Sequence, residues 1–173
     1  MIRALALCLC AAVWLAAARP ARADEVDEVS RQFRAGQRTE ALARAERFLA
    51  ARPSDAAMRF QKGVMLGELM RRDEAIETFE RLTQDYPDLP EPYNNLAVLL
   101  SDRGDIDQAK TALEAALRNN PDFAVAHENL GDLHLVLASR SYARAAKLDP
   151  ANASATTKLR LARDLLARLK PAP

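Results

Sequence analysis

Cysteine is nearly absent from this sequence, and the two cysteines that it has stand close together near its start. They are Cys8 and Cys10 in a chain of 173 residues, and both lie in an apolar stretch that we interpret below as a leader. The remainder of the chain offers no disulfide, no thiol nucleophile and no cysteine ligand for a metal ion. A fold without these supports must be held together by side-chain packing alone.

Glycine, aromatic residues and net charge are low as well. The chain has five glycines, 5% aromatic residues and a formal net charge of +1. It contains no glycine-rich phosphate loop, and a charge of +1 provides no basic field that would attract nucleic acid. By contrast, 49% of the residues are apolar. This fraction excludes intrinsic disorder, because disordered chains are poor in apolar residues.

Residues 1–23 predict a secretory signal peptide. Arg3 precedes an uncharged apolar run over residues 4–18, and small residues lead up to Ala23. A basic start, a short apolar core and an Ala-x-Ala exit are typical of such leaders, so we expect cleavage between Ala23 and Asp24. The apolar run is shorter than the roughly 20 residues that a spanning helix needs. Retention at the membrane by an uncleaved leader stays open as an alternative.

Removal of the leader changes the composition of the chain. The leader holds three arginines and no acid, so the net charge falls from +1 to −2. Both cysteines and the single tryptophan, Trp14, leave with it. We therefore expect an exported protein, periplasmic if the source is bacterial. The alternative location is the periplasmic face of the inner membrane.

A period of 34 residues runs through the rest of the chain. Three prolines recur at this interval, Pro53, Pro87 and Pro121. Three alanines recur at the same interval, twelve residues ahead of the prolines, Ala41, Ala75 and Ala109. Several coincidences in one register indicate an internal repeat.

This pattern resembles the tetratricopeptide repeat, a helix–turn–helix unit of 34 residues. The clearest match lies in residues 90–123, at Tyr93, Leu96, Ala97, Leu100, Ala109, Leu113 and Pro121. The resemblance implies an all-α, right-handed helix–turn–helix solenoid of three to four repeats with a C-terminal capping helix. The expected repeats are 24–55, 56–89, 90–123 and a shortened 124–152, followed by a capping helix at 153–170 and a tail at 171–173.

Within each repeat, particular residues are expected to shape the hairpin. Polar residues are expected to cap the second helices, namely Thr39, Asp73 and Asp107. Small residues are expected to let the paired helix approach, namely Gly63, Ala97 and Gly131. Large residues are expected to fill the space opposite them, namely Phe79, Leu113 and Tyr142. The prolines are expected to stop the second helices, because proline lacks the amide and clashes with the preceding turn.

The last repeat breaks the period. Pro150 follows Pro121 by 29 residues rather than 34, and no glycine or proline interrupts residues 135–148. We favour one continuous helix over 124–148, and the alternative is a cramped helix pair that turns near Ser139. After Pro150, Asn152 and Ser154 are expected to cap a final basic helix.

The sequence provides no set of residues that predicts catalysis, and we expect no enzyme, no cofactor and no small-molecule substrate. No Gly-x-Ser-x-Gly elbow is present. His127 and His134 lack a third metal ligand, and they stand where the repeat has packing residues. We therefore interpret both histidines as core or half-buried packing residues and expect no metal site.

The resemblance implies that the first helices of successive repeats line a concave groove that holds a peptide or a partner's helix. The expected groove residues are Phe60, Val64, Glu68, Asn94, Asn95, Val98, Asp102, Glu128, Asn129, Asp132 and Val136. Asn95 and Asn129 match the asparagine that such domains use to bind a peptide backbone, and the alternative for both is a local bond between helices. Phe60 and Val64 replace the lysine and asparagine of carboxylate-clamp repeats, so that kind of recognition is not expected.

These residues indicate a groove of mixed apolar and acidic character, which favours a partner with apolar anchors and some basic residues. The function that we expect is an exported adaptor in bacterial cell-envelope assembly or quality control, which binds a protein or peptide partner. The alternative is a structural module that associates with itself. Membrane contact is expected only through the leader or the basic final helix.

Overall fold

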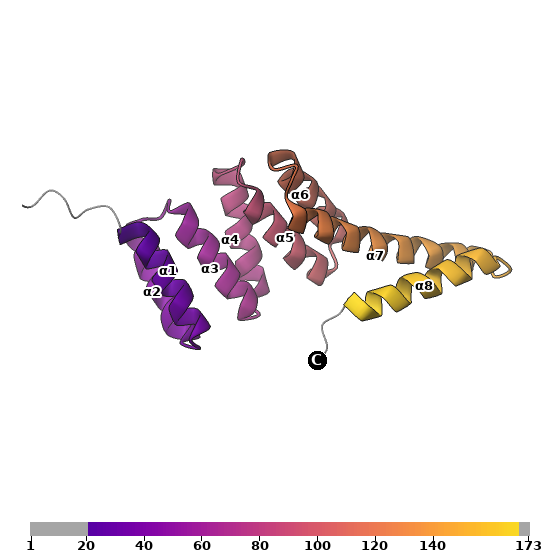
Figure 1. Ribbon diagram of the computed structural model, residues 1–173, viewed down its shortest axis with the longest axis horizontal. Coiled ribbons are helices and arrows are strands. Elements are labelled where there is room, and N and C mark those ends of the chain that lie inside the picture. The colour runs from indigo at the N-terminus through magenta and orange to yellow at the C-terminus, as the bar shows by residue number, and fades with distance from the viewer. Residues whose placement is uncertain (1–20, 170–173) are drawn as a thin grey trace, which may run out of the picture. The chain divides into compact units, whose positions relative to one another are not determined.

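The computed structural model describes residues 21–169, with side chains from Asp24 onward. Most of the predicted leader and the tail at 171–173 lie outside the described residues. Between residues 21 and 169 the chain forms helices joined by short turns and has no strand (Figure 1). It divides into two compact units between Gln61 and Lys62, and each unit is described separately below.

The first unit contains α1 (Ala21–Arg34), α2 (Arg38–Ala51) and the beginning of α3 (Ala56–Glu68). Helix α1 packs against α2, and the apolar side chains between them are buried, namely Val29, Phe33, Ala41, Leu42 and Ala45.

An ion pair at the surface also joins α1 to α2. Arg44 Nε donates to Glu25 Oε1 at 2.7 Å. This hydrogen bond holds the pKa of Glu25 below its ordinary value of 4.5.

The second unit contains the rest of α3 and five further helices, α4 (Arg72–Asp85), α5 (Pro90–Arg103), α6 (Ile106–Asn119), α7 (Ala124–Leu148) and α8 (Ala153–Leu169). Helix α5 is central to this unit, because it packs against α4, α6 and α7. Helix α8 runs back along α7 in the opposite direction (Figure 1).

The 34-residue period corresponds directly to buried side chains and helix ends. The three periodic alanines are fully buried, Ala41, Ala75 and Ala109. Helices α2, α4 and α6 each end two residues before a periodic proline, at Ala51, Asp85 and Asn119. Proline cannot donate the next helical hydrogen bond. The structure thus confirms that the prolines mark the ends of the second helices.

The predicted caps of these helices were wrong by two residues. Thr39, Asp73 and Asp107 are the second residues of α2, α4 and α6, and no side-chain hydrogen bond caps these helices. Asp73 and Asp107 instead lie in the first turn, where a negative charge interacts favourably with the helix dipole.

Side-chain caps occur at two other helices. Asp55 Oδ1 accepts a hydrogen bond from the Met58 amide at the start of α3, at 3.0 Å. Asn152 Oδ1 accepts one from the Ala155 amide at the start of α8, at 2.9 Å. The prediction for Asn152 is therefore confirmed, whereas Ser154 lies inside α8.

The turns between paired helices use a residue with positive φ at the same place in the period. φ is 88° at Gly36, 60° at Met70 and 96° at Gly104, and these residues follow one another by 34. Glycine adopts positive φ without a steric penalty from Cβ, so Met70 is the strained member of the series. The next position in this register is Ala138, which lies inside α7.

Helix α7 runs without interruption from Ala124 to Leu148, which confirms the continuous helix rather than a pair that turns near Ser139. Alanine is the best helix former, and Ala138 occupies the position where the preceding repeats turn. Since the chain does not turn back there, the last repeat has no short second helix. Helix α8 packs against α7 instead.

The close approach predicted at Gly63 is present, and the one predicted at Gly131 is not. A Cβ atom built on Gly63 would lie 2.7 Å from Cζ of the buried Phe79. A Cβ on Gly131 would meet nothing within 4 Å. The prediction for Gly131 was wrong because α7 continues past it and no paired helix lies opposite. Tyr142 is half-buried further along α7 and lies under the ammonium group of Lys158.

Candidate functional site

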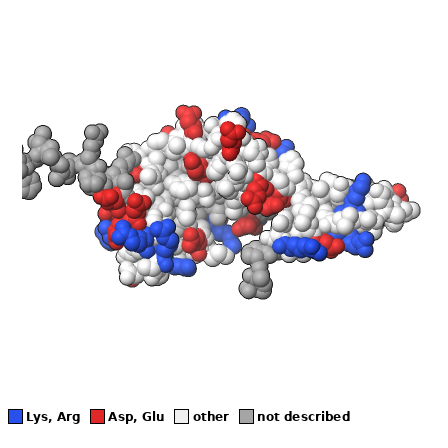
Figure 2. All heavy atoms as spheres, viewed as in Figure 1, with Lys and Arg blue, Asp and Glu red and all other residues white. Residues whose placement is uncertain are grey.

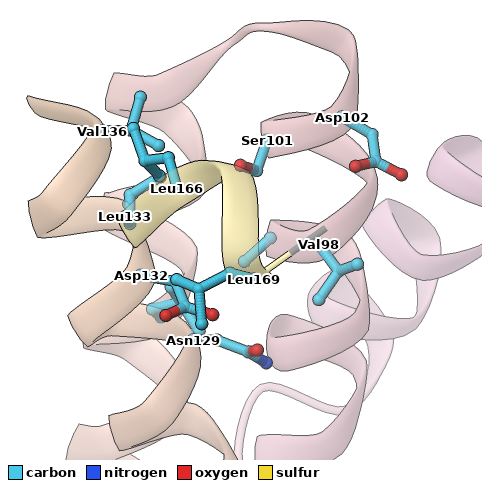
Figure 3. Close-up of a pocket in the computed structure, with 11 residues that line it drawn as sticks. Val98, Ser101, Asp102, Asn129, Asp132, Leu133, Val136, Leu166 and Leu169 are labelled. Atoms are coloured by element: carbon cyan, nitrogen blue, oxygen red, sulfur yellow. The ribbon is translucent and has the colours of Figure 1, made fainter. Parts of the chain in front are cut away.

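Helices α3, α5 and α7 present their side chains to a groove in the second unit. One part of it, which we call the α5–α7 hollow, has a volume of about 250 Å³. Its lining includes Val98, Ser101 and Asp102 from α5 and Asn129, Asp132, Leu133 and Val136 from α7 (Figure 3).

A second part of the groove, the α3–α5 hollow, lies on the other side of α5 and has a volume of about 260 Å³. Its lining includes Val64 and Glu68 from α3 and Asn95 from α5. Val98 and Asp102 line both hollows. They stand one helical turn apart on α5, so the two hollows form one continuous groove.

The structure brings together eight of the eleven side chains that the sequence predicts for the groove. They are Val64, Glu68, Asn95, Val98, Asp102, Asn129, Asp132 and Val136. Asn94 is buried, with 6% of its surface exposed, and Glu128 is exposed on α7 but lines neither hollow. Phe60 belongs to the first unit, and its place in a groove stays a prediction.

The two groove asparagines already make hydrogen bonds within the protein. Asn129 Nδ2 donates to Asn94 Oδ1 at 2.8 Å, which joins α7 to α5. Asn95 Nδ2 donates to the Glu91 carbonyl one turn earlier in α5, at 2.9 Å. The bond between helices is therefore the correct alternative for Asn129. Asn95 bonds within its own helix, and both side chains retain their carbonyl oxygens as acceptors.

The groove carries negative charge that pairs with no cation among the described residues. Glu68, Asp102 and Asp132 line it, and none of the three forms an ion pair with any residue between 21 and 169. Val64, Val98 and Val136 provide apolar surface among these acids. The mixed apolar and acidic character that the sequence predicts is thus present in the groove.

Helix α8 also contributes to the groove, which the sequence does not predict. Leu166 and Leu169 from the last turns of α8 line the α5–α7 hollow (Figure 3). The sequence does place these leucines on one helical face with Leu159 and Ala162. It offers no signal that this face reaches beyond α7, because that depends on the direction in which α8 runs back from Pro150.

The two histidines are not packing residues, and this prediction was wrong. His127 and His134 are both exposed, and His127 Nε2 lies 2.8 Å from the Pro121 carbonyl oxygen. Both stand on the part of α7 that would be covered if a second helix turned back against it.

No cluster of His, Cys, Asp or Glu within residues 21–169 could hold a metal ion. Over the same range, no helix is both long enough and apolar enough to cross a membrane.

Solved structures with a similar arrangement of helices include peptide-bound proteins. The first TPR of Spaghetti (RPAP3) bound to the HSP90 peptide SRMEEVD is 16% identical, with a TM-score of 0.62 over 67% of this chain and 92% of that chain. The Yersinia enterocolitica type III secretion chaperone SycD in complex with a YopD peptide is 14% identical, with a TM-score of 0.61 over 68% and 95%. MamA is 18% identical, with a TM-score of 0.61 over 82% and 80%.

These likenesses confirm the predicted fold class, an all-α helix–turn–helix solenoid. Two family models described as tetratricopeptide repeat match residues 26–90 and 70–133. The matched residues include the periodic alanines and prolines and five complete helices. The chain therefore belongs to the tetratricopeptide repeat family, over residues 26–133.

Proposed function

We propose that this protein is an exported, non-catalytic adaptor that binds a peptide or helix of a partner protein in its groove. The observation that carries the proposal is the continuous groove through Val98 and Asp102. The peptide complexes of RPAP3 and SycD support it, because they have a similar fold.

The predicted leader supports a place in the bacterial cell envelope, in assembly or quality control. Mass spectrometry of protein purified from the native host tests this location. We expect a chain that begins at Asp24 and lacks the fluorescence of Trp14. Recovery of the full-length chain from the inner membrane would support retention by an uncleaved leader instead.

Site-specific crosslinking in the native host tests the groove. A photoreactive phenylalanine analogue at Val98 should capture a partner, because Val98 lines both hollows. The control is the same analogue at Gln84, which is exposed on α4 outside the groove. Equal capture at the two positions, or no capture at Val98, would contradict the proposal.

A matched pair of charge reversals then tests the chemistry of the captured partner. Asp132 and Glu128 are both exposed acids on α7, one turn apart, but only Asp132 lines the groove. Asp132→Arg should weaken binding to the purified partner, and Glu128→Arg should have a smaller effect. Affinity should also fall as salt increases, since ions screen exposed charges. A partner that binds more tightly to Asp132→Arg would show that the groove does not select basic residues.

Self-association is the second candidate function, and exposed leucines on α8 favour it. Leu161 is 59% exposed and Leu165 is 48% exposed, and neither lines the α5–α7 hollow. Sedimentation at several protein concentrations separates the two functions. The adaptor should remain monomeric, whereas a structural module should form oligomers that Leu161→Asp disrupts.

A further inference from the structure

We propose that the C-terminal end of α8 is an internal occupant of the groove, which a basic, leucine-bearing helix of the partner displaces. This inference rests on the proposed function and adds to it the chemistry of the partner and a means of regulation. It depends on three observations, which concern where α8 ends, how loosely it is held and which charges it leaves unpaired.

The first observation is the position of the last turns of α8. Leu166 and Leu169 lie three residues apart, so both point to the same side of the helix. Figure 3 shows this side directed toward Val98 of α5 and Val136 of α7, and all four side chains line the α5–α7 hollow. Two leucines on one helical turn are the kind of anchors by which an amphipathic helix enters an apolar groove.

The second observation is that α8 is held by few buried side chains. Only Ala155 and Ala162 are buried on this helix, and both are small. Leu166 is half-buried and Leu169 is 48% exposed. Between residues 21 and 169, α8 packs against α7 alone, and no ion pair joins the two helices. Elements with few buried apolar contacts open at low free-energy cost, so α8 is suited to leave the groove.

The third observation is that α8 does not use the charges of the groove. Helix α8 carries four basic residues, Lys158, Arg160, Arg163 and Arg168, and a single acidic residue, Asp164. Figure 2 shows this basic row along α8. Within the described chain, none of the four forms an ion pair, and Asp102 and Asp132 of the groove form none either.

The unpaired acids explain how a partner could replace α8. A ligand shifts an equilibrium only by binding one state more tightly than the other. A partner helix that places leucines in the α5–α7 hollow, and a cation near Asp102 or Asp132, would make every contact that α8 makes there. It would also gain ion pairs that α8 lacks. We therefore infer a partner segment that resembles α8 in composition and differs from it in the placement of its cations.

A peptide with the sequence of α8 itself provides a defined probe. We would label KLRLARDLLARL, residues 158–169, and measure its affinity for the full chain by fluorescence anisotropy. Three proteins are compared, namely the wild type, Leu166→Asp/Leu169→Asp and Leu161→Asp/Leu165→Asp. The last is a matched control, because it changes two leucines of the same helix that do not line the groove. Circular dichroism checks that all three retain the same helix content.

We expect the peptide to bind Leu166→Asp/Leu169→Asp at least about tenfold more tightly than the wild type, because the apparent affinity is reduced by the fraction of groove that is open. The control variant, Leu161→Asp/Leu165→Asp, should bind the peptide as weakly as the wild type does. Adding Val136→Asp to the first variant should abolish the gain, because it places a charge in the apolar part of the α5–α7 hollow.

Two outcomes would overturn the inference. Equal affinity for the wild type and Leu166→Asp/Leu169→Asp would show that α8 does not compete for the groove. An equal gain in affinity for Leu161→Asp/Leu165→Asp would show that destabilising α8 as a whole, rather than removing Leu166 and Leu169 from the hollow, increases peptide binding. If crosslinking at Val98 still captures a partner in either case, the groove function stands and only the role of α8 fails. If that crosslinking fails as well, both proposals fall.

Discussion

The α5–α6 pair and the α7–α8 pair are both helix pairs joined by short turns, yet they bury very different side chains. In the first pair the buried apolar residues are Leu96, Ala97, Leu99, Leu100, Ile106, Ala109, Ala112, Leu113 and Ala116. In the second they are Ala126, Leu133, Ala155 and Ala162, of which only one is larger than alanine. The pair that keeps the 34-residue period is a packed core element, and the pair that breaks the period is not.

The difference follows from how many neighbours each helix has. Among the described residues, helix α5 packs against α4, α6 and α7, whereas α8 packs against α7. A repeat with a neighbour on each side buries both faces of its helices. Where the period is lost, α8 therefore buries few side chains in the core, and its C-terminal end lines the groove instead.

The largest expected effect is on the free energy of unfolding, when leucine is replaced by alanine once in the α5–α6 pair and once in the α7–α8 pair. Leu113→Ala in α6 should lower the free energy of unfolding by about 2–5 kcal/mol, the range for fully buried leucines. Leu166→Ala in α8 should lower it by about 1 kcal/mol, because half burial forfeits part of the roughly 1.5–3 kcal/mol of full burial. Urea unfolding followed by circular dichroism measures both. Equal losses would mean that α8 is as firmly packed as α6.

The two glycines provide a sharper comparison, since the same change should have opposite signs. Gly63→Ala should destabilise the protein by about 1–3 kcal/mol, because the new Cβ would overpack against the buried Phe79 ring. Gly131→Ala should stabilise it by about 0.5–1 kcal/mol, since its surroundings are open and alanine favours the helix. Thermal unfolding measures both, and a loss of stability in Gly131→Ala would indicate a neighbour that the structure does not show.

The smallest expected effect concerns the ion pair of the α1–α2 pair, a kind of contact that α7 and α8 lack among the described residues. Pairing with Arg44 lowers the pKa of Glu25 in the folded state. Its stabilising contribution is therefore complete above the ordinary pKa of 4.5 and is lost as the pH falls through the lowered pKa.

Glu25→Gln should accordingly be slightly less stable than the wild type at neutral pH. The two proteins should converge in strongly acidic solution. Urea unfolding at several pH values measures the difference. Glu40→Gln serves as the control, because Glu40 is exposed on α2 and forms no ion pair with the described residues. A difference that persists at low pH would mean that the pair is not its cause.

Where the sequence kept the period, it predicted the structure well. The spacing of the alanines and prolines predicted which residues are buried and where helices end, because both depend on short-range geometry. The caps were misplaced because each second helix begins one residue before the polar residue that the sequence assigned as its cap. Asn94 and Asn95 were assigned to the same face although consecutive helical residues diverge by about 100°.

Where the period was lost, the sequence predicted less. The continuity of α7 was predictable from the absence of a chain breaker. The predictions of a close approach at Gly131 and of packing at His127 and His134 nevertheless assumed an ordinary helix pair, and all three residues are exposed. The part of α8 in the groove was beyond prediction, because it depends on the tertiary path of the chain after Pro150. Local residue patterns do not encode that path.

The position of Leu169 has a practical consequence for handling the protein. An affinity tag added after Pro173 is separated by four residues from Leu169, whose side chain lines the groove. Four residues span at most about 14 Å, so the tag itself can reach the binding surface, and a polyhistidine or acidic tag would alter its charge. Affinities measured with such a tag should be compared with those measured after its removal.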